Sequence, residues 1–364
     1  MTTVLNTATT KAQSNNSYFG IAIGFVVLAG ALVMGQVSGA CFNPAIGMLA
    51  AFQGDGPDMW VYLLGPSVGG ILAGLLFRVL NPSEWDDNDP LAKLTESHHN
   101  PDGNLTRLAS MLSMEFVGTF FVAYTVALTS KGNSVTAFIA PGAMLVSMVY
   151  AGGAISGSHF NPAVTVGVYL RGLVEKPHLM RIWDCFFYIG VQLLGAFAGG
   201  SCAAYVAGGY ESIASPAVNT AEYSFFEAVV AEFLYSSLLV LTVLSVATNK
   251  KVGGNSYFGV AIGFTIISGT VAVGAISGGC FNPAIGIALP SMASNQPDDV
   301  WVYIIGDMLG SAAAAVLYVF WYSVEGDPNQ KFVHARLAPE DEERTSDNVS
   351  MKQGLLKDFE GGGV

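Results

Sequence analysis

Long apolar runs separated by short polar segments dominate the hydropathy pattern of this chain. A helix needs about 20 mostly apolar residues to cross the hydrocarbon layer of a membrane, and runs of that length recur from near the N-terminus to position 323. The pattern therefore predicts an all-α membrane protein. The predicted membrane spans are residues 19–38, 59–80, 107–129, 135–155, 180–208, 222–247, 257–276 and 299–323.

Composition and charge agree with a membrane location. Apolar residues make up 52% of the sequence and charged residues only 12%, which is not typical of a soluble protein. Most of the acids behind the net charge of −12 lie in two polar segments, 83–102 and 325–360, which we expect to be solvated. If the N-terminus is cytosolic, every Lys and Arg except Lys131 lies on the cytosolic side, as the positive-inside rule expects. The sequence thus predicts a multi-pass protein with both termini in the cytosol, in a plasma or internal membrane.

An internal repeat organises the chain. Residues 4–47 align with 243–286 without a gap, and the blocks NSYFG, AIGF and CFNPAIG are identical in both. The match continues from MWVYLLG at 59–65 to VWVYIIG at 300–306, so each copy contains a span, a polar segment and a second span. A related segment, SGSHFNPAVTVG at 156–167, follows a different pair of spans and predicts the opposite half of a two-half protein.

Three Asn-Pro-Ala triplets each begin an apolar run that is too short to cross a bilayer. Proline fits the first turn of a helix and the preceding Asn can cap it, so each triplet predicts a loop followed by a half-helix. Such backbone survives at membrane depth only inside protein or against a water-filled cavity. Two half-helices meeting end to end would repel cations and offer Asn amides to a passing neutral solute. The triplets are Asn43, Pro44 and Ala45; Asn161, Pro162 and Ala163; and Asn282, Pro283 and Ala284.

With this order of spans and triplets, residues 107–325 resemble the major intrinsic protein family of aquaporins and aquaglyceroporins. The resemblance implies an aquaporin-like six-helix bundle with two re-entrant half-helices, built as inverted repeats, and a homotetramer with one pore per subunit. The other segments are an extra unit of helix, half-helix and helix at 1–82, an acidic linker at 83–106 and an acidic tail at 326–364. The expected partners are water, small neutral solutes and membrane lipid, and the pattern predicts no catalysis, cofactor, metal or nucleic-acid binding.

Two intramembrane acids match positions with a supporting role in this family. Glu115 in MEFVGTF and Glu232 in AEFLYSS lie in corresponding helices of the two halves, and the resemblance implies that each carboxylate accepts hydrogen bonds from a half-helix loop. The residues alone leave a proton relay open as an alternative. His159, just before Asn161, matches a histidine common in this loop; it either gates the pore or is hydrogen-bonded in the packing.

The family also places a four-residue selectivity filter near the outer mouth, and counting from the Asn residues assigns Pro141, Thr270, Gly279 and Ile285 to it. Water-selective members usually carry Phe, His, a small residue and Arg there. Loss of the Phe, His and Arg side chains predicts a wider, less polar opening that rejects larger neutral solutes and cations less strongly. We therefore expect passage of water and of small solutes such as glycerol, urea or ammonia.

Several alternatives stay open at this stage. In one interpretation the sequence is an incomplete tandem double channel, and the leading half is what remains of its first pore unit. In the other the chain is real as given, and the leading half covers the outside of the pore unit, pairs with another subunit or competes with 222–325 for residues 107–210. We expect 107–210 to pair with 222–325, which would leave Asn43 lining no complete pore. Other function classes are a nonconducting membrane scaffold and a cation-coupled secondary transporter. The transporter would need ionisable residues near the half-helices, and few occur there.

Overall fold

The computed structural model describes residues 1–52, 59–84, 104–129, 135–174, 180–293 and 297–324. Within these residues every regular element is helical, so the predicted all-α class is confirmed. Residues 1–318 form one compact unit, and beyond it the description reaches only the end of the last helix. The predicted acidic tail and most of the acidic linker lie outside the described residues.

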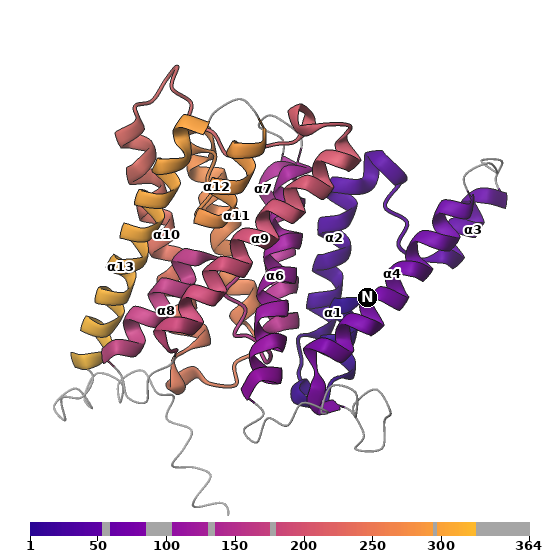
Figure 1. The fold of residues 1–364 in the computed structure, drawn as a ribbon, viewed down its shortest axis with the longest axis horizontal. Helices are drawn as coiled ribbons and strands as arrows, with labels where there is room; N and C mark the ends of the chain where they lie inside the picture. The colour runs from indigo at the N-terminus through magenta and orange to yellow at the C-terminus, as the bar shows by residue number, and fades with distance from the viewer. Residues whose placement is uncertain (53–58, 85–103, 130–134, 175–179, 294–296, 325–364) are drawn as a thin grey trace, which may run out of the picture. The chain divides into compact units, whose positions relative to one another are not determined.

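The helices follow the order that hydropathy predicts (Figure 1). The leading part consists of α1 (Thr2–Val4), η1 (Leu5–Thr9), η2 (Lys11–Gln13), α2 (Phe19–Ser38), α3 (Pro44–Phe52), α4 (Met59–Leu80) and η4 (Pro82–Glu84). The first half of the main unit consists of α6 (Asn104–Ala127), α7 (Val135–Gly152), α8 (Pro162–Val174), α9 (Ile182–Ala207) and η5 (Tyr210–Ser212). Its second half consists of α10 (Phe225–Ala247), η6 (Lys250–Val252), α11 (Phe258–Ser277), α12 (Pro283–Met292), η7 (Pro297–Asp299) and α13 (Val300–Val324).

Seven of the described helices are long and apolar enough to cross a membrane, namely α2, α4, α6, α9, α10, α11 and α13. The eighth predicted span, 135–155, corresponds to α7, whose segment Phe138–Gly152 is a shorter apolar helix. It ends earlier than predicted because the chain turns at Gly153. The helices α8 and α12 are short and apolar, as predicted for the half-helices. These observations describe an integral multi-pass membrane protein.

Local sequence signals set several helix ends. Ser224 and Glu227 form a reciprocal capping box at the start of α10, which satisfies backbone N–H groups that have no partner within the helix. At the C-terminal ends, Gly39, Gly208 and Gly278 adopt left-handed backbone conformations after α2, α9 and α11. Glycine occupies this conformation without the steric cost that a Cβ atom brings.

Glycines let the spanning helices of each half approach closely. A Cβ atom at Gly195 or Gly199 of α9 would collide with the backbone of α6, and one at Gly310 of α13 would collide with the backbone of α10. Gly263 of α11 likewise lies against α7. Small residues at helix interfaces are the usual basis of packing in lipid, where apolar burial alone gives little drive. Thus α6 with α9 and α10 with α13 form corresponding pairs in the two halves.

The leading segment packs on the side of α7 that α11 leaves open. Ser147 of α7 donates a hydrogen bond of 2.8 Å to the carbonyl of Ala22 in α2. Tyr18 stacks on Tyr150 with ring centroids 4.4 Å apart, and Phe258 contacts both rings edge-on. The half-helix α3 packs on α4, and Figure 1 shows it away from α8 and α12. Consequently α7 lies between two copies of one repeated helix, α2 and α11.

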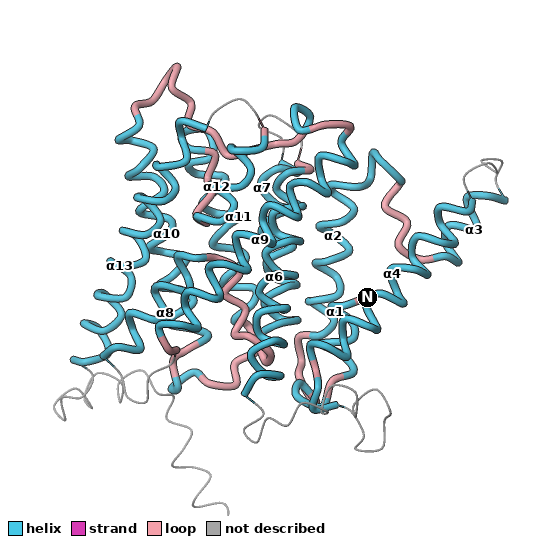
Figure 2. The backbone as a smooth tube through the Cα atoms, viewed as in Figure 1, coloured by secondary structure: helices cyan, strands magenta, loops and turns pink. Residues whose placement is uncertain are grey.

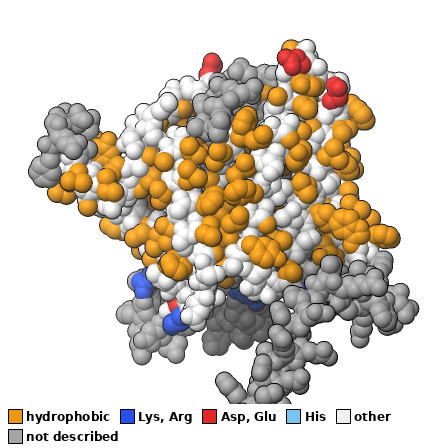
Figure 3. Space-filling model, turned by 180° about the vertical axis from the view of Figure 1, so that it is seen from behind, with side chains coloured by type: hydrophobic (Ala, Val, Ile, Leu, Met, Phe, Trp, Pro, Cys, Tyr) orange, Lys and Arg blue, Asp and Glu red, His pale blue; other side chains and the backbone are white. Residues whose placement is uncertain are grey.

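The surface has the polarity of a membrane protein. In the space-filling view, apolar side chains spread over the middle of the visible face, acidic side chains appear at its upper edge and Lys and Arg at its lower edge (Figure 3). Large apolar side chains on the spanning helices are exposed, among them Leu72, Phe186, Phe226, Val271, Val316 and Phe320. An apolar band flanked by charged edges fits a bilayer, because lipid solvates the band and water solvates the edges.

Candidate pore and its two half-helices

Each half-helix of the main unit begins at its triplet as the sequence predicts. Pro162 is the first residue of α8 and Pro283 the first of α12. The Oδ1 atom of Asn161 accepts a hydrogen bond of 2.8 Å from the backbone N–H of Ala163. Asn282 does the same for Ala284 at 3.1 Å. The Asn side chains therefore cap the helices, and proline occupies a position where no intrahelical N–H donor is needed.

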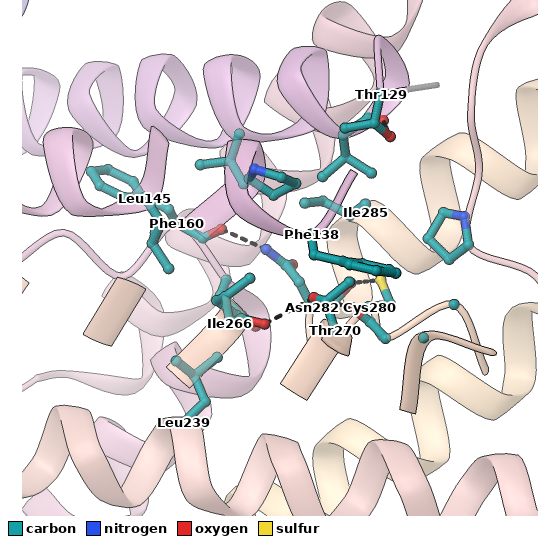
Figure 4. A pocket seen from close by; sticks show the side chains of 18 of the residues that line it. Thr129, Phe138, Leu145, Phe160, Leu239, Ile266, Thr270, Cys280, Asn282 and Ile285 are labelled. Atoms are coloured by element: carbon teal, nitrogen blue, oxygen red, sulfur yellow. Dashed lines mark hydrogen bonds between the residues drawn. The ribbon is translucent and has the colours of Figure 1, made fainter. Parts of the chain in front are cut away.

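The two half-helix starts are joined to each other by a reciprocal pair of hydrogen bonds. The Nδ2 group of Asn161 donates to the carbonyl of Phe281 at 2.7 Å, and that of Asn282 donates to the carbonyl of Phe160 at 2.9 Å (Figure 4). Phe160 and Phe281 have positive φ values of 50° and 51°, a conformation that is uncommon for aromatic residues. Both loops enter the bundle beside α8 and α12 (Figure 2). The two halves of the main unit are thus coupled at the triplets.

Two fully buried carboxylates anchor these loops. Glu115 on α6 accepts from the Ser156 hydroxyl at 2.6 Å, the His159 N–H at 2.9 Å and the Phe160 N–H at 2.6 Å. Gln192 on α9 adds a fourth hydrogen bond of 2.9 Å from its Nε2 group. An intramembrane acid needs such partners, because an isolated charge in this environment is costly.

Glu232 on α10 holds the second loop in the same manner. It accepts from the Ser277 hydroxyl at 2.6 Å, the Cys280 N–H at 3.0 Å and the Phe281 N–H at 2.7 Å. The two acids therefore bind equivalent positions of the two loops.

The imidazole of His159 has a packed environment. Its Nδ1 atom lies 3.2 Å from the hydroxyl of Thr165, and its ring meets that of Tyr188 edge-on at 5.3 Å. The side chain is buried but also lies in the wall of the central cavity. The structure therefore gives this residue hydrogen-bonded packing together with access to the candidate pore.

A cavity of about 460 Å³ runs past the coupled triplets and takes its walls from both halves. All four predicted filter residues, Pro141, Thr270, Gly279 and Ile285, line it together with Asn161 and Asn282. The Thr270 hydroxyl donates to the carbonyl of Ile266 at 2.8 Å, so its proton is used within its own helix. Of the described residues that line the cavity, none is Lys, Arg, Asp or Glu.

The cavity also has lining residues that sequence reasoning did not identify. Phe138 lies one turn before Pro141 on α7, and Figure 4 shows its ring beside Ile285 and Thr270. The segment 213–217, between the two halves, contributes a further part of the wall. Helical spacing from Pro141 could have suggested Phe138. The connecting segment carries no motif, so only the folded chain shows its position.

A second cavity of about 430 Å³ adjoins the first at the opposite end from the filter. Both cavities share Val149, Ser158, Val243 and Ile262. Its remaining wall includes the segment 12–18 of the leading half and the matching segment 253–256 of the main unit. The leading half therefore contributes directly to one mouth of the candidate pore, which the sequence did not predict.

The triplet of the leading half occupies a different environment. Asn43 caps the backbone N–H of Ala45 at 3.0 Å, as in the other triplets. However, Asn43 is exposed and lines neither of these cavities. Its neighbours Phe42 and Ile46 are 49% and 59% exposed. A half-helix start is present, but no second half-helix of the described elements meets it.

An all-α membrane protein with two coupled half-helices around a cavity belongs to the class of channel-like inverted-repeat proteins. The model of the major intrinsic protein family matches residues 1–77 and 104–318, and the chain belongs to this family. Proteins of the family are membrane channels for water or small solutes and not enzymes. The match covers the leading half as well as the main unit.

Two aquaporins of Oryza sativa subsp. japonica show the same affiliation. The chain is 34% identical over 172 residues to probable aquaporin TIP2-2 of Oryza sativa subsp. japonica, a match covering 47% of this chain and 65% of the relative. It is 31% identical to aquaporin NIP1-4 of the same plant, over 57% of this chain and 75% of the relative. The aquaglyceroporin structure from Plasmodium falciparum matches with a TM-score of 0.49 and 19% identity, over 57% of this chain and 94% of that one.

Proposed function

We propose that this protein is a passive channel for water and small neutral solutes, which cross the membrane through the cavity between α8 and α12. The observation that carries the proposal is the reciprocal pairing of Asn161 and Asn282 with the opposite loops, beside a cavity that both halves line. This arrangement places polar groups at membrane depth where a solute can replace water.

The half-helix starts supply suitable chemistry for neutral solutes. Each Asn amide has two N–H donors, and the hydrogen bond to the opposite loop uses one of them, so a second remains for a passing molecule. The positive ends of α8 and α12 raise the energy of a cation at this point. A neutral molecule with an oxygen or nitrogen acceptor suffers no such penalty. The absence of Lys, Arg, Asp and Glu among the described lining residues also disfavours the cation-coupled transporter.

The filter supports a broad range of small solutes. Pro141, Thr270, Gly279 and Ile285 provide no cationic side chain, and Phe138 adds an apolar ring. Few fixed donors at the constriction mean that a solute is selected mainly by size and less by hydrogen bonding. We therefore propose glycerol, urea or ammonia as additional permeants. The other possibility, a nonconducting scaffold, is an outcome of the flux experiment below.

The proposed orientation places both termini in the cytosol. The Lys and Arg side chains visible in Figure 3 gather at its lower edge, whereas most of the visible acids lie at its upper edge, as the positive-inside rule expects. The second cavity, with its 12–18 wall, is then the cytosolic mouth. We propose a homotetramer of such subunits, with 107–325 as the pore unit, 1–82 as the additional half-unit and 83–106 as its linker.

Stopped-flow light scattering of proteoliposomes containing the full chain tests this function. An impermeant osmolyte should shrink these vesicles faster than protein-free vesicles, and a glycerol gradient should give rapid re-swelling. Shrinkage without re-swelling would restrict the pore to water. Vesicles that contain intact protein but shrink no faster than empty ones would contradict the channel proposal and favour the scaffold.

A further inference from the structure

A second acid lies beside Glu232 in the middle of α13. The repeat makes its presence conspicuous, because MWVYLLG at 59–65 is followed by Pro66 and the matching VWVYIIG at 300–306 is followed by Asp307. Asp307 is 0% exposed and lies within a predicted membrane span. A buried acid at this depth needs a partner or a proton.

Asp307 corresponds to Gln192 in the other half. A Cβ atom at Gly195, three residues after Gln192, would strike the carbonyl of Phe116, and one at Gly310, three residues after Asp307, would strike the carbonyl of Phe233. Phe116 follows Glu115, and Phe233 follows Glu232. The helix pairs α6–α9 and α10–α13 therefore place Gln192 and Asp307 at equivalent points beside the two loop-anchoring acids.

The hydrogen bonds of Asp307 leave one oxygen without a donor. Its Oδ1 atom accepts from the Ser236 hydroxyl at 2.8 Å. Its Oδ2 atom is buried, and no N–H or O–H group of the described residues donates to it. The carboxyl group lies within hydrogen-bonding contact of Glu232, and Gly306 brings α13 against the Cβ atom of Glu232. An oxygen in this position is satisfied only if it is itself the donor.

The carboxylate of Glu232 already accepts hydrogen bonds from the loop. Three groups donate to it, namely the Ser277 hydroxyl and the N–H groups of Cys280 and Phe281, and this pattern favours its ionised form. Two carboxylates in contact inside a dry protein do not both ionise, because their repulsion adds to the cost of desolvation. The remaining proton therefore belongs on the oxygen that lacks a donor.

We propose that Asp307 is a resident proton-binding site, which holds its proton at neutral pH and donates a hydrogen bond through Oδ2 to Glu232. The protonated carboxyl then does for Glu232 what the Gln192 amide does for Glu115 at 2.9 Å. Asp307 is a positioning residue in this account, because it supports the acid that holds the loop before Asn282. This inference concerns protonation and does not depend on which solutes pass.

Infrared spectroscopy of the full chain in liposomes at neutral pH tests the proton directly. Wild type should show the C=O absorption of a buried protonated carboxyl group, shifted in heavy water, and Asp307→Asn should remove it. Asp298→Asn is a matched control, since Asp298 is exposed just before α13. Absence of the band in wild type, or its persistence in Asp307→Asn, would overturn the proposal, whether or not the protein conducts water.

A substitution series tests the positioning role. Asparagine can still donate a hydrogen bond to Glu232, so Asp307→Asn should fold and keep its water permeability within about twofold of wild type. Asp307→Ala should lose about tenfold in water permeability, because this is the effect of one hydrogen bond to a charged group. If Asp307→Asn loses as much water permeability as Asp307→Ala, or fails to assemble, the proposal that Asp307 acts as a neutral hydrogen-bond donor is wrong.

Discussion

The two copies of the repeated segment, 16–47 and 255–286, fold alike but lie in different surroundings. In both, a cysteine Sγ atom contacts the carbonyl of the triplet Asn, at 3.4 Å for Cys41 and Asn43 and at 3.2 Å for Cys280 and Asn282. Yet Asn282 is 6% exposed, whereas Asn43 is exposed. Local sequence therefore determines the half-helix start but not its use.

The difference arises from elements outside the repeat. The main copy is held by Glu232 on the preceding helix and faces the loop that contains Phe160. For the leading copy, no carboxylate of the described residues accepts a hydrogen bond from the N–H groups of Cys41 and Phe42, and the loop contacts are those of Cys41 and Asn43 with their own loop. The leading copy also has no opposed half-helix among the described elements. A triplet contributes to the candidate pore only when an acid anchors its loop and a second half-helix meets it.

Removing the carboxylate of Glu232, which anchors the loop of the main copy, should have the largest effect on water permeability. Glu232→Ala leaves the buried N–H groups of Cys280 and Phe281 without an acceptor, and we expect water permeability to fall by at least about 100-fold because each unsatisfied group costs about 1–3 kcal/mol. The shrinkage rate of proteoliposomes in stopped-flow light scattering, divided by the amount of assembled protein, measures this loss of water permeability. Glu84→Ala, which removes an acceptor for Thr10 in the leading half, is the control. Equal losses in both variants would show that the anchoring acid has no special role.

Replacing the triplet Asn by Ala in each copy separates the contribution of the opposed half-helix to water permeability from that of the helix cap. Asn282→Ala removes the cap of α12 and the bond to the Phe160 carbonyl, whereas Asn43→Ala removes only a cap. The expected loss of water permeability is about tenfold for Asn282→Ala and less than about twofold for Asn43→Ala. Comparable losses would mean that the leading triplet also lies on the conducting path.

Hydropathy and triplet spacing predict most of this fold because they are local properties. The starts of α8 and α12 and the spanning helices follow from counting along the chain, whereas the four residues assigned to a filter through the family resemblance line the cavity and their filter role stays a prediction. The places of Gln192 and Asp307 do not follow from counting, because each residue acquires its place through contact with another helix. The sequence also does not predict that segment 12–18 forms part of the wall of the second cavity, because the repeat alone does not reveal that α2 packs on α7.

Introducing a cation at Ile285, in the proposed filter, should sharpen the selectivity of the main copy. Ile285 is 3% exposed and lines the cavity, so Ile285→Arg would narrow the opening and add fixed donors. We expect the ratio of glycerol to water permeability to fall by about fivefold, as pocket changes of this kind shift discrimination by about 1 kcal/mol. Ile285→Val is the control that retains an apolar side chain. An equal decrease of both permeabilities would indicate a blocked pore and not a filter.

The smallest effect is expected where the leading copy docks. Tyr18 stacks on Tyr150 and donates a hydrogen bond of 2.9 Å to Gln13, whereas its counterpart Tyr257 is 51% exposed. Tyr18→Ala should lower the thermal unfolding temperature of the detergent-solubilised chain by about 2–4 °C, because an aromatic pair contributes about 0.5–1.5 kcal/mol beyond its buried area. Tyr257→Ala should shift it less. If both variants lose the same stability, the leading half does not depend on this contact, and α2 must be held to α7 by its other interactions.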